Sequence, residues 1–172
     1  MEKKQPFRAL SKICLNNWHY IDRKILTFSQ GINFFTGHSG SGKSTVIDAL
    51  QIVLYANTDG RAFFNKAAAD DSDRSLIEYL RGMVNIGENN EFQYLRNKNF
   101  SSTIVLEFEQ TDTKEKQCVG VVFDVDTATH EVGRLFFWHT GGLLENHYRA
   151  DRRCLTTAEI REYLQRSFSP DE

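Results

Sequence analysis

Residues 37–45 constrain this chain more strongly than any other part of its sequence. They match the pattern G-x-x-x-x-G-K-[ST], whose glycines let the backbone approach phosphate groups closely. Backbone N–H groups and the positive end of the following helix then form a nest for the β-phosphate. The residues expected to hold a nucleoside triphosphate are Gly37, His38, Ser39, Gly40, Ser41, Gly42, Lys43, Ser44 and Thr45.

Three of these side chains have distinct expected roles. Lys43 should place its ammonium against the β- and γ-phosphates, and the Ser44 hydroxyl should ligate Mg²⁺. Thr45 is expected to reach the α-phosphate. A chance glycine-rich turn is the alternative, but a mostly apolar run at 32–36 precedes the loop and a helical pattern begins near Lys43. This strand–loop–helix context favours a phosphate loop.

The segments around the loop read as alternating strands and helices. Residues 10–15 and 25–28 suggest two strands joined at the polar corner Asn16-Asn17, and 32–36 suggests a buried strand. After the loop, apolar residues fall on more than one face of the helix, which predicts that it is buried within the domain. They are Val46, Ile47, Leu50, Val53 and Leu54.

The rest of the chain predicts an irregular loop, an antiparallel β-meander and two more helices. Residues 57–73 are polar and read as an irregular loop, and 75–83 reads as a helix. Strand-like stretches at 103–108, 118–124 and 134–139 suggest an antiparallel meander. Thr156-x-x-Glu159 is a capping-box pattern that predicts a terminal helix with Ile160, Leu164 and Phe168 on one stripe.

Composition narrows the class of protein. A chain of 172 residues, 40% hydrophobic and 26% charged, is typical of one soluble domain. The net charge of -2 argues against wholesale coating of nucleic acid but permits a local basic patch. No apolar run reaches the roughly 20 residues of a membrane span, and the N-terminus lacks a signal core. Cys14, Cys118 and Cys154 are widely spaced, which predicts reduced thiols in a cytosolic protein, and no histidine pair suggests a metal site.

The segment 10–55 resembles the N-terminal half of ABC-type ATPase heads of the SMC, MukB and SbcC class. That class has a β-hairpin with an Asn-aromatic corner, then G-I-N before the loop, and D-A followed by leucine in the helix. The matching residues are Asn17, Trp18, Gly31, Ile32, Asn33, Asp48, Ala49 and Leu54. Segments 64–68, 73–82 and 94–96 also resemble the MukB/SbcC-like subunit, JetC or EptC, of the bacterial Wadjet plasmid-defence complex.

The resemblance implies an α/β fold of the P-loop NTPase, ABC/SMC-head type: a mixed sheet, the Walker A helix and an antiparallel β-meander. Residues 1–172 would be one domain, the N-terminal lobe of a split head, with the coiled coil and C-terminal lobe absent. ATP and Mg²⁺ are the implied cofactors. The implied partners are the chain's own C-terminal half-head, a second head that dimerises on ATP, kleisin-type and other subunits, and double-stranded DNA through the assembled complex. The protein is expected in the bacterial cytoplasm, associated with the nucleoid or a plasmid, and no membrane partner is expected.

The sequence departs from that class in three ways. After the loop there is no Walker B run ending in Asp-Glu, no L-S-G-G signature and no heptad stretch, so no catalytic residue is expected in this fragment. The glutamine loop that contacts Mg²⁺ in such heads is expected beyond residue 172. Ser39 stands where the class usually has Asn beside the γ-phosphate, which puts γ-phosphate sensing there in doubt.

The resemblance also suggests residues outside the loop. His19 and Tyr20 follow the hairpin corner and are candidates for the ribose and α-phosphate, with core packing of Trp18 and Tyr20 as the alternative. Arg81 is a candidate nucleotide contact, or else a surface ion-pair partner. Asp48 should support the loop or be solvated. A DNA-facing strip would comprise Lys66, Arg74, Arg96 and Lys98.

Two other functions compete with an ATP-binding half-head of a DNA-acting motor. The first is a self-sufficient small P-loop NTPase or nucleotide kinase, although the chain shows no arginine-rich lid and no N-K-x-D motif. The second is a non-catalytic module that binds nucleotide only to regulate assembly. Missing hydrolytic residues predict binding with little turnover by the chain alone.

Overall fold

The computed structural model describes residues 4–56, 76–85 and 91–168 of the 172-residue chain. Its largest element is a five-stranded sheet with the order β2-β1-β5-β6-β7. The strands are β1 (Arg8–Trp18), β2 (Ile21–Thr27), β5 (Phe100–Gln110), β6 (Lys116–Asp126) and β7 (Glu131–Thr140). The helices are α1 (Lys43–Tyr55), α2 (Leu76–Arg81) and α3 (Thr157–Phe168), and the two small hairpins are β3 (Met83–Asn85) with β4 (Phe92–Tyr94) and β8 (Arg149–Ala150) with β9 (Arg153–Cys154).

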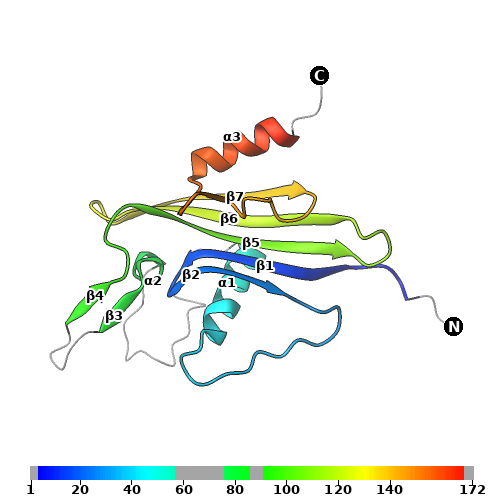
Figure 1. The fold of residues 1–172 in the computed structure, drawn as a ribbon, viewed down its shortest axis with the longest axis horizontal. Helices are drawn as coiled ribbons and strands as arrows, with labels where there is room; N and C mark the ends of the chain where they lie inside the picture. The colour runs from blue at the N-terminus through cyan, green and yellow to red at the C-terminus, as the bar shows by residue number, and fades with distance from the viewer. Residues whose placement is uncertain (1–3, 57–75, 86–90, 169–172) are drawn as a thin grey trace.

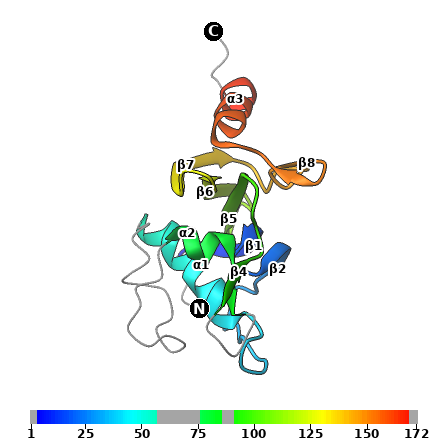
Figure 2. The same ribbon diagram turned by 90° about the vertical axis from the view of Figure 1, so that its left-hand side faces the viewer.

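The sheet separates two apolar layers (Figures 1 and 2). Because side chains alternate along each strand, Ile13 and Ile104 face α1 and α2, whereas Cys14 and Val105 face the other way. Figure 2 shows α3 on the opposite side of the sheet from α1 and α2. The phosphate-loop helix and the β8–β9 hairpin therefore lie over opposite faces of one sheet (Figures 1 and 2).

The predicted hairpin and meander are confirmed, and their strands are longer than the apolar segments suggested. The corner predicted at Asn16-Asn17 is wrong, because both asparagines lie in β1 and the turn between β1 and β2 is His19-Tyr20. Asn17 and His19 adopt positive φ angles of 50° and 51° there. β5, β6 and β7 follow one another as neighbours. All four pairings in this sheet are antiparallel, so the described residues contain no parallel pairing of the kind that a mixed sheet includes.

The predicted buried strand at 32–36 is wrong. These residues have no regular secondary structure, and Ile32 and Phe34 are 80% and 83% exposed. A strand needs a neighbour that accepts and donates its ladder hydrogen bonds. No strand among the described residues pairs with this segment, so an apolar composition alone does not make it a strand.

The phosphate-loop helix was predicted at the right place, but its complete burial is wrong. Val46, Ala49 and Ile52 pack on the sheet, whereas Ile47 and Leu54 are 40% and 60% exposed. Helix α2 confirms the prediction for 75–83, with Ile77 and Leu80 buried. The loop predicted at 57–73 lies outside the described residues, and no helix in the described part is long and apolar enough to cross a membrane.

The capping box at the start of α3 is formed as predicted. The Thr156 N–H donates to Glu159 Oε1 at 3.1 Å, and the Glu159 N–H donates to Thr156 Oγ1 at 3.2 Å. Arg153 adds two hydrogen bonds to the same carboxylate, at 2.6 and 2.9 Å. Ile160 is fully buried, so the cap holds a helix that closes one side of the sheet.

Glu159 makes α3 sensitive to acid. The hydrogen bonds from Arg153, and then that from the Thr156 backbone, lower the pKa of Glu159 from 4.5 to about 2. Because the pKa of Glu159 is lower in the folded protein, its ionised carboxylate stabilises the fold fully above pH 4.5. This stabilisation is lost as the pH falls from 4.5 towards 2. We expect Glu159→Gln to lower the midpoint of urea unfolding at pH 7 and to differ progressively less from the parent below pH 4.5. Glu162→Gln, on the exposed face of the same helix, is the control; a pH-independent difference for Glu159→Gln would contradict this role.

Candidate nucleotide-binding site

The phosphate loop lies between an irregular segment and the first turn of α1. Gly40 and Gly42 have φ angles of 80° and 92°, in the left-handed region that favours glycine. A Cβ atom on Gly37 would lie 2.5 Å from Ser41 Oγ, so this position also requires glycine. The Ser41 N–H donates to the His38 carbonyl at 3.2 Å, which closes the loop on itself.

The start of α1 presents backbone donors without a competing side chain. Gly42 is the N-cap residue and supplies no capping group, and the first turn contains no acidic residue. The first N–H groups of a helix have no intrahelical acceptor, and the helix dipole adds positive potential there. An anion is therefore favoured at this end of α1, where the loop glycines leave room for it.

Lys43 is folded back over the loop. Its Nζ donates to the carbonyl oxygens of Gly37 at 2.7 Å and His38 at 2.8 Å, and to Ser41 Oγ at 3.2 Å. The ammonium therefore lies above the nest of backbone N–H groups, where phosphate oxygens of a bound nucleotide can replace these acceptors. The residues present fit a nucleoside triphosphate in this respect.

Two buried side chains attach the start of α1 to the rest of the domain. Trp18 Nε1 donates to the Thr45 carbonyl at 2.9 Å, and the Tyr79 hydroxyl donates to Asp48 Oδ2 at 2.8 Å. The rings of Trp18 and Tyr79 lie 4.8 Å apart. The solvated alternative for Asp48 is thus wrong: Asp48 is buried and joins α1 to α2, and its support of the loop stays a prediction. Sequence analysis missed Tyr79, and no local signal could have paired it with a residue 31 positions earlier.

His19 and Tyr20 pack against α2 and β3. His19 is 5% exposed, its ring stacks on Tyr79 with centroids 4.0 Å apart, and its Nδ1 lies 3.1 Å from the Tyr79 carbonyl. The Tyr20 hydroxyl donates to the Met83 carbonyl at 2.8 Å, and Tyr20 is 51% exposed. The alternative prediction, that Trp18 and Tyr20 pack in the core, is therefore confirmed for Trp18 and wrong for Tyr20. A contact of His19 or Tyr20 with nucleotide stays a prediction.

Arg81 and Arg96 hold the segment after β4 in place. Arg81 lies over the Tyr94 ring at 3.9 Å, and its Nε donates to the Arg96 carbonyl at 3.1 Å. Arg96 Nη1 donates to the carbonyls of His19 and Leu80, at 2.5 and 2.8 Å, and Nη2 donates to that of Ile21 at 3.2 Å. Burial lowers the pKa of Arg96.

This engagement argues against Arg96 as a member of a DNA-facing strip, because its guanidinium is occupied by backbone carbonyls. Lys98 is exposed beside it. Lys66 and Arg74 lie outside the described residues. The predicted strip therefore has one exposed member that the structure describes. The surface ion-pair alternative for Arg81 is also wrong, since its described partners are neutral.

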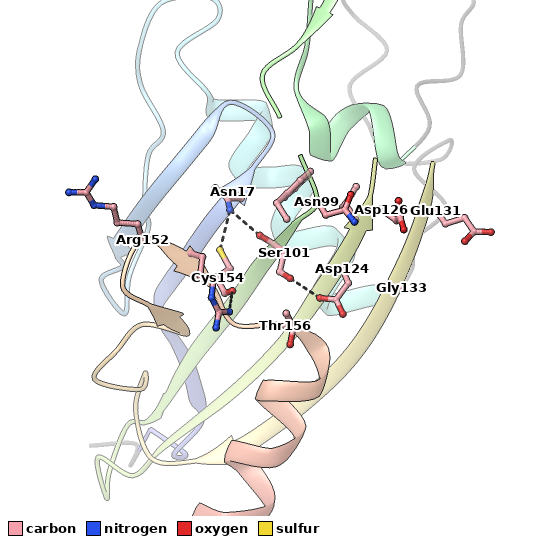
Figure 3. A pocket seen from close by; sticks show the side chains of 13 residues that line it. Asn17, Asn99, Ser101, Asp124, Asp126, Glu131, Gly133, Arg152, Cys154 and Thr156 are labelled. Atoms are coloured by element: carbon pink, nitrogen blue, oxygen red, sulfur yellow. Dashed lines mark hydrogen bonds between the residues drawn. The ribbon is translucent and has the colours of Figure 1, made fainter. Parts of the chain in front are cut away.

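A cavity of about 630 Å³ lies away from the phosphate loop (Figure 3). It lies between the ends of β5 and β6, the β8–β9 hairpin and the start of α3. Asp124 accepts hydrogen bonds from Ser101 Oγ at 2.7 Å and Thr157 Oγ1 at 2.7 Å, and Asn17 Nδ2 donates to the Ser101 carbonyl at 3.0 Å. These hydrogen bonds hold neighbouring elements together, so we interpret the cavity as a junction between those elements.

The predicted reduced thiols are consistent with their surroundings. Cys14, Cys118 and Cys154 are free and buried. Burial raises the pKa of Cys14 and of Cys154 to about 11, and that of Cys118 to about 12. Among the described residues no group of three or more His, Cys, Asp or Glu side chains could hold a metal ion.

Comparison with known proteins finds a family match in the first part of the chain. Residues 10–71 match the family model described as the P-loop containing region of AAA domain. The DNA repair protein RecN of Synechocystis sp. (strain ATCC 27184 / PCC 6803 / Kazusa) is 36% identical over 52 residues, which are 30% of this chain and 9% of RecN. This chain therefore covers less than a tenth of the relative's length.

A solved chain described under "Structural biochemistry of ATP-driven dimerization and DNA stimulated activation of SMC ATPases" is 14% identical, with a TM-score of 0.43 over 91% of both chains. The family match contains the β1–β2 hairpin, the phosphate loop and α1. The predicted fold class, α/β of the P-loop NTPase type, is confirmed.

Proposed function

We propose that this chain is the ATP- and Mg²⁺-binding N-terminal half of an SMC-like ATPase head that acts on DNA. The observation that carries the proposal is the position of Lys43: its ammonium lies over a glycine loop at the uncapped start of α1. The similarity to RecN, a DNA repair protein, supports the choice of DNA-acting ATPases among P-loop proteins.

The chain's own residues would bind and orient the triphosphate. Backbone N–H groups of the loop and of the first turn of α1 would hold the β-phosphate, and Lys43 would neutralise charge on the β- and γ-phosphates. Ser44 would supply one oxygen to Mg²⁺, and Thr45 would approach the α-phosphate. The hydrogen bonds of Trp18 and Tyr79 fix the start of α1, and with it these groups, relative to the rest of the domain.

An exposed apolar surface supports the half-head proposal. Ile32 and Phe34 precede the loop and are 80% and 83% exposed, and Ile47 and Leu54 face outward from α1. Large exposed apolar patches mark interaction surfaces. A C-terminal half-head that supplied a neighbouring strand would let residues 32–36 form the strand that their composition favours, and it would bring the catalytic acids.

The finer proposals rest on the family resemblance. A second head would join on ATP, and kleisin-type and other subunits would complete a complex that reaches double-stranded DNA. Segments 94–96 and 73–82 favour a place in Wadjet-type plasmid defence in a bacterial cytoplasm. His19, Tyr20 and Arg81 would serve the nucleotide only through a change in their present contacts.

Binding and turnover by the purified chain test the proposal. We expect Mg-ATP to bind with measurable heat in calorimetry, while phosphate release stays at the background of a sample without protein, because no residue that would orient water is evident. A chain that binds no ATP would contradict the proposal. Brisk turnover would contradict the half-head and favour a self-sufficient small P-loop NTPase or nucleotide kinase; transfer to a nucleoside monophosphate would identify the kinase.

A further inference from the structure

A group of cations lies on the face of the sheet opposite α1. It consists of Lys12 and Arg23 on β1 and β2, and of Arg149 and Arg152 in the β8–β9 hairpin, and we call these four residues the basic cluster. Lys12 and Arg23 share a sheet face with Cys14, because they pair with Thr27 and Asn16 in the alternating register. The β8–β9 side of the molecule covers that face, since Asn16 Nδ2 donates to the His147 carbonyl at 2.9 Å.

Arg23 contacts the segment that leads into the β8–β9 hairpin, and Arg149 contacts the backbone of Arg152 within that hairpin. Arg23 Nη2 donates to His147 Nδ1 at 2.8 Å, and Arg149 Nη2 donates to the Arg152 carbonyl at 2.7 Å. His147 adopts a positive φ of 51°, which turns the chain into the hairpin. The side chain of Arg152 extends away from the other labelled side chains in Figure 3 and is exposed.

The carboxylates nearest in sequence to the basic cluster, Asp22 and Asp151, are exposed. The basic cluster forms no ion pair with a carboxylate of the described residues, in contrast to Arg153 beside it, which pairs with Glu159. Arg149 is half-buried, and its Nε and Nη1 are buried with no hydrogen-bond acceptor in the described structure. Arg149 therefore contributes an uncompensated positive charge beneath this surface, and that charge would stabilise an anion bound at the surface.

Neighbouring groups register the same positive potential. The pKa of His147 is lowered by burial first, and then by the charges of Arg23 and Lys12. Burial raises the pKa of Cys14, and both Arg23 and Arg149 oppose that rise. The charges of Lys12, Arg23 and Arg149 therefore act on one region of the molecule, around His147 and Cys14.

We infer that the basic cluster binds the phosphate groups of a nucleic-acid backbone. Unpaired Arg and Lys on one surface are the groups that contact backbone phosphates, and arginine presents forked donors that fit phosphate oxygens. This inference deepens the proposed function, on which it rests for the choice of nucleic acid over another polyanion. It places the contact at the basic cluster and not at Arg96, whose guanidinium is occupied by backbone carbonyls.

Charge reversal at one exposed arginine tests the inference. Arg152→Glu removes a side chain for which the described structure gives no hydrogen bond, and Arg134→Glu, on exposed β7, is the control with the same charge change. Binding of a fluorescent 20-base-pair duplex to the full chain is followed by anisotropy over a range of salt concentrations. We expect Arg152→Glu to weaken binding about tenfold and to reduce the slope of log K against log salt by about one, with little change for Arg134→Glu.

Three results would overturn the inference. The parent chain could fail to bind the duplex, Arg134→Glu could weaken binding as much as Arg152→Glu, or inorganic phosphate alone could raise the melting temperature in an Arg152-dependent way without duplex binding. The last result would assign the cluster to a free phosphate compound. Mg-ATP binding measured on the same samples separates this failure from that of the proposed function, because Arg152 is remote from the phosphate loop and should leave ATP affinity unchanged.

Discussion

Replacing Lys43 with alanine should weaken Mg-ATP binding by roughly a hundredfold, the largest functional effect that we expect from one substitution. Lys43 Nζ already donates to two loop carbonyls and to Ser41 Oγ, and bound phosphates would exchange these neutral acceptors for charged ones. A hydrogen bond to a charged group contributes about 1.5–3 kcal/mol, and roughly 2.8 kcal/mol corresponds to a hundredfold change in Kd. Isothermal titration calorimetry measures the affinity directly.

Lys24→Ala is the matched control, because it removes the same charge from an exposed position on β2. We expect its affinity to equal that of the parent chain. A Lys43→Ala protein that is folded, with unchanged far-ultraviolet circular dichroism, and binds Mg-ATP as tightly as the parent would show that the loop does not hold the triphosphate. The nucleotide-binding proposal would then fail.

Replacing Trp18 with alanine should produce the largest loss of stability. Trp18 is fully buried, contacts the Tyr79 ring, and donates its indole N–H to the Thr45 carbonyl. Truncating a buried aromatic residue to alanine costs about 3–5 kcal/mol, which is a large fraction of the roughly 5–15 kcal/mol that stabilises a domain. Urea unfolding followed by circular dichroism measures the change.

Trp18→Phe separates packing from the hydrogen bond. It keeps an aromatic ring in the same pocket but cannot donate to Thr45, so we expect a smaller loss of stability together with weaker Mg-ATP binding. A loss below about 1 kcal/mol for Trp18→Ala would contradict the structure, because it would mean that the site tolerates a cavity of this size without cost.

The features that were predicted correctly are those whose causes lie within a few neighbouring residues. The glycines of the phosphate loop require particular φ angles, and Thr156 and Glu159 satisfy each other's backbone N–H groups three residues apart. The β5–β6–β7 meander follows from runs of β-branched and aromatic residues separated by short turns. Such causes act locally, so they are visible in the order of the residues.

The errors occurred where the outcome depends on residues distant in the chain. Residues 32–36 have a strand-like composition, but a strand forms only beside a neighbour, and the described structure provides none for them. Helix α1 was expected to be buried all round, yet only the face towards the sheet is covered. Burial depends on which elements pack on each face, and composition does not state that.

The sequence by itself therefore determined the proposed phosphate site: a loop at residues 37–45, with Lys43 as its cation. Only the tertiary structure decided what the other cations do. Arg96 is held by three carbonyls from the β1–β2 hairpin and α2, whereas Lys12, Arg23, Arg149 and Arg152 have no ion-pair partner among the described residues. The physical reason is that the role of a charge depends on its neighbours in space, which folding brings from β1, β2, β8 and β9.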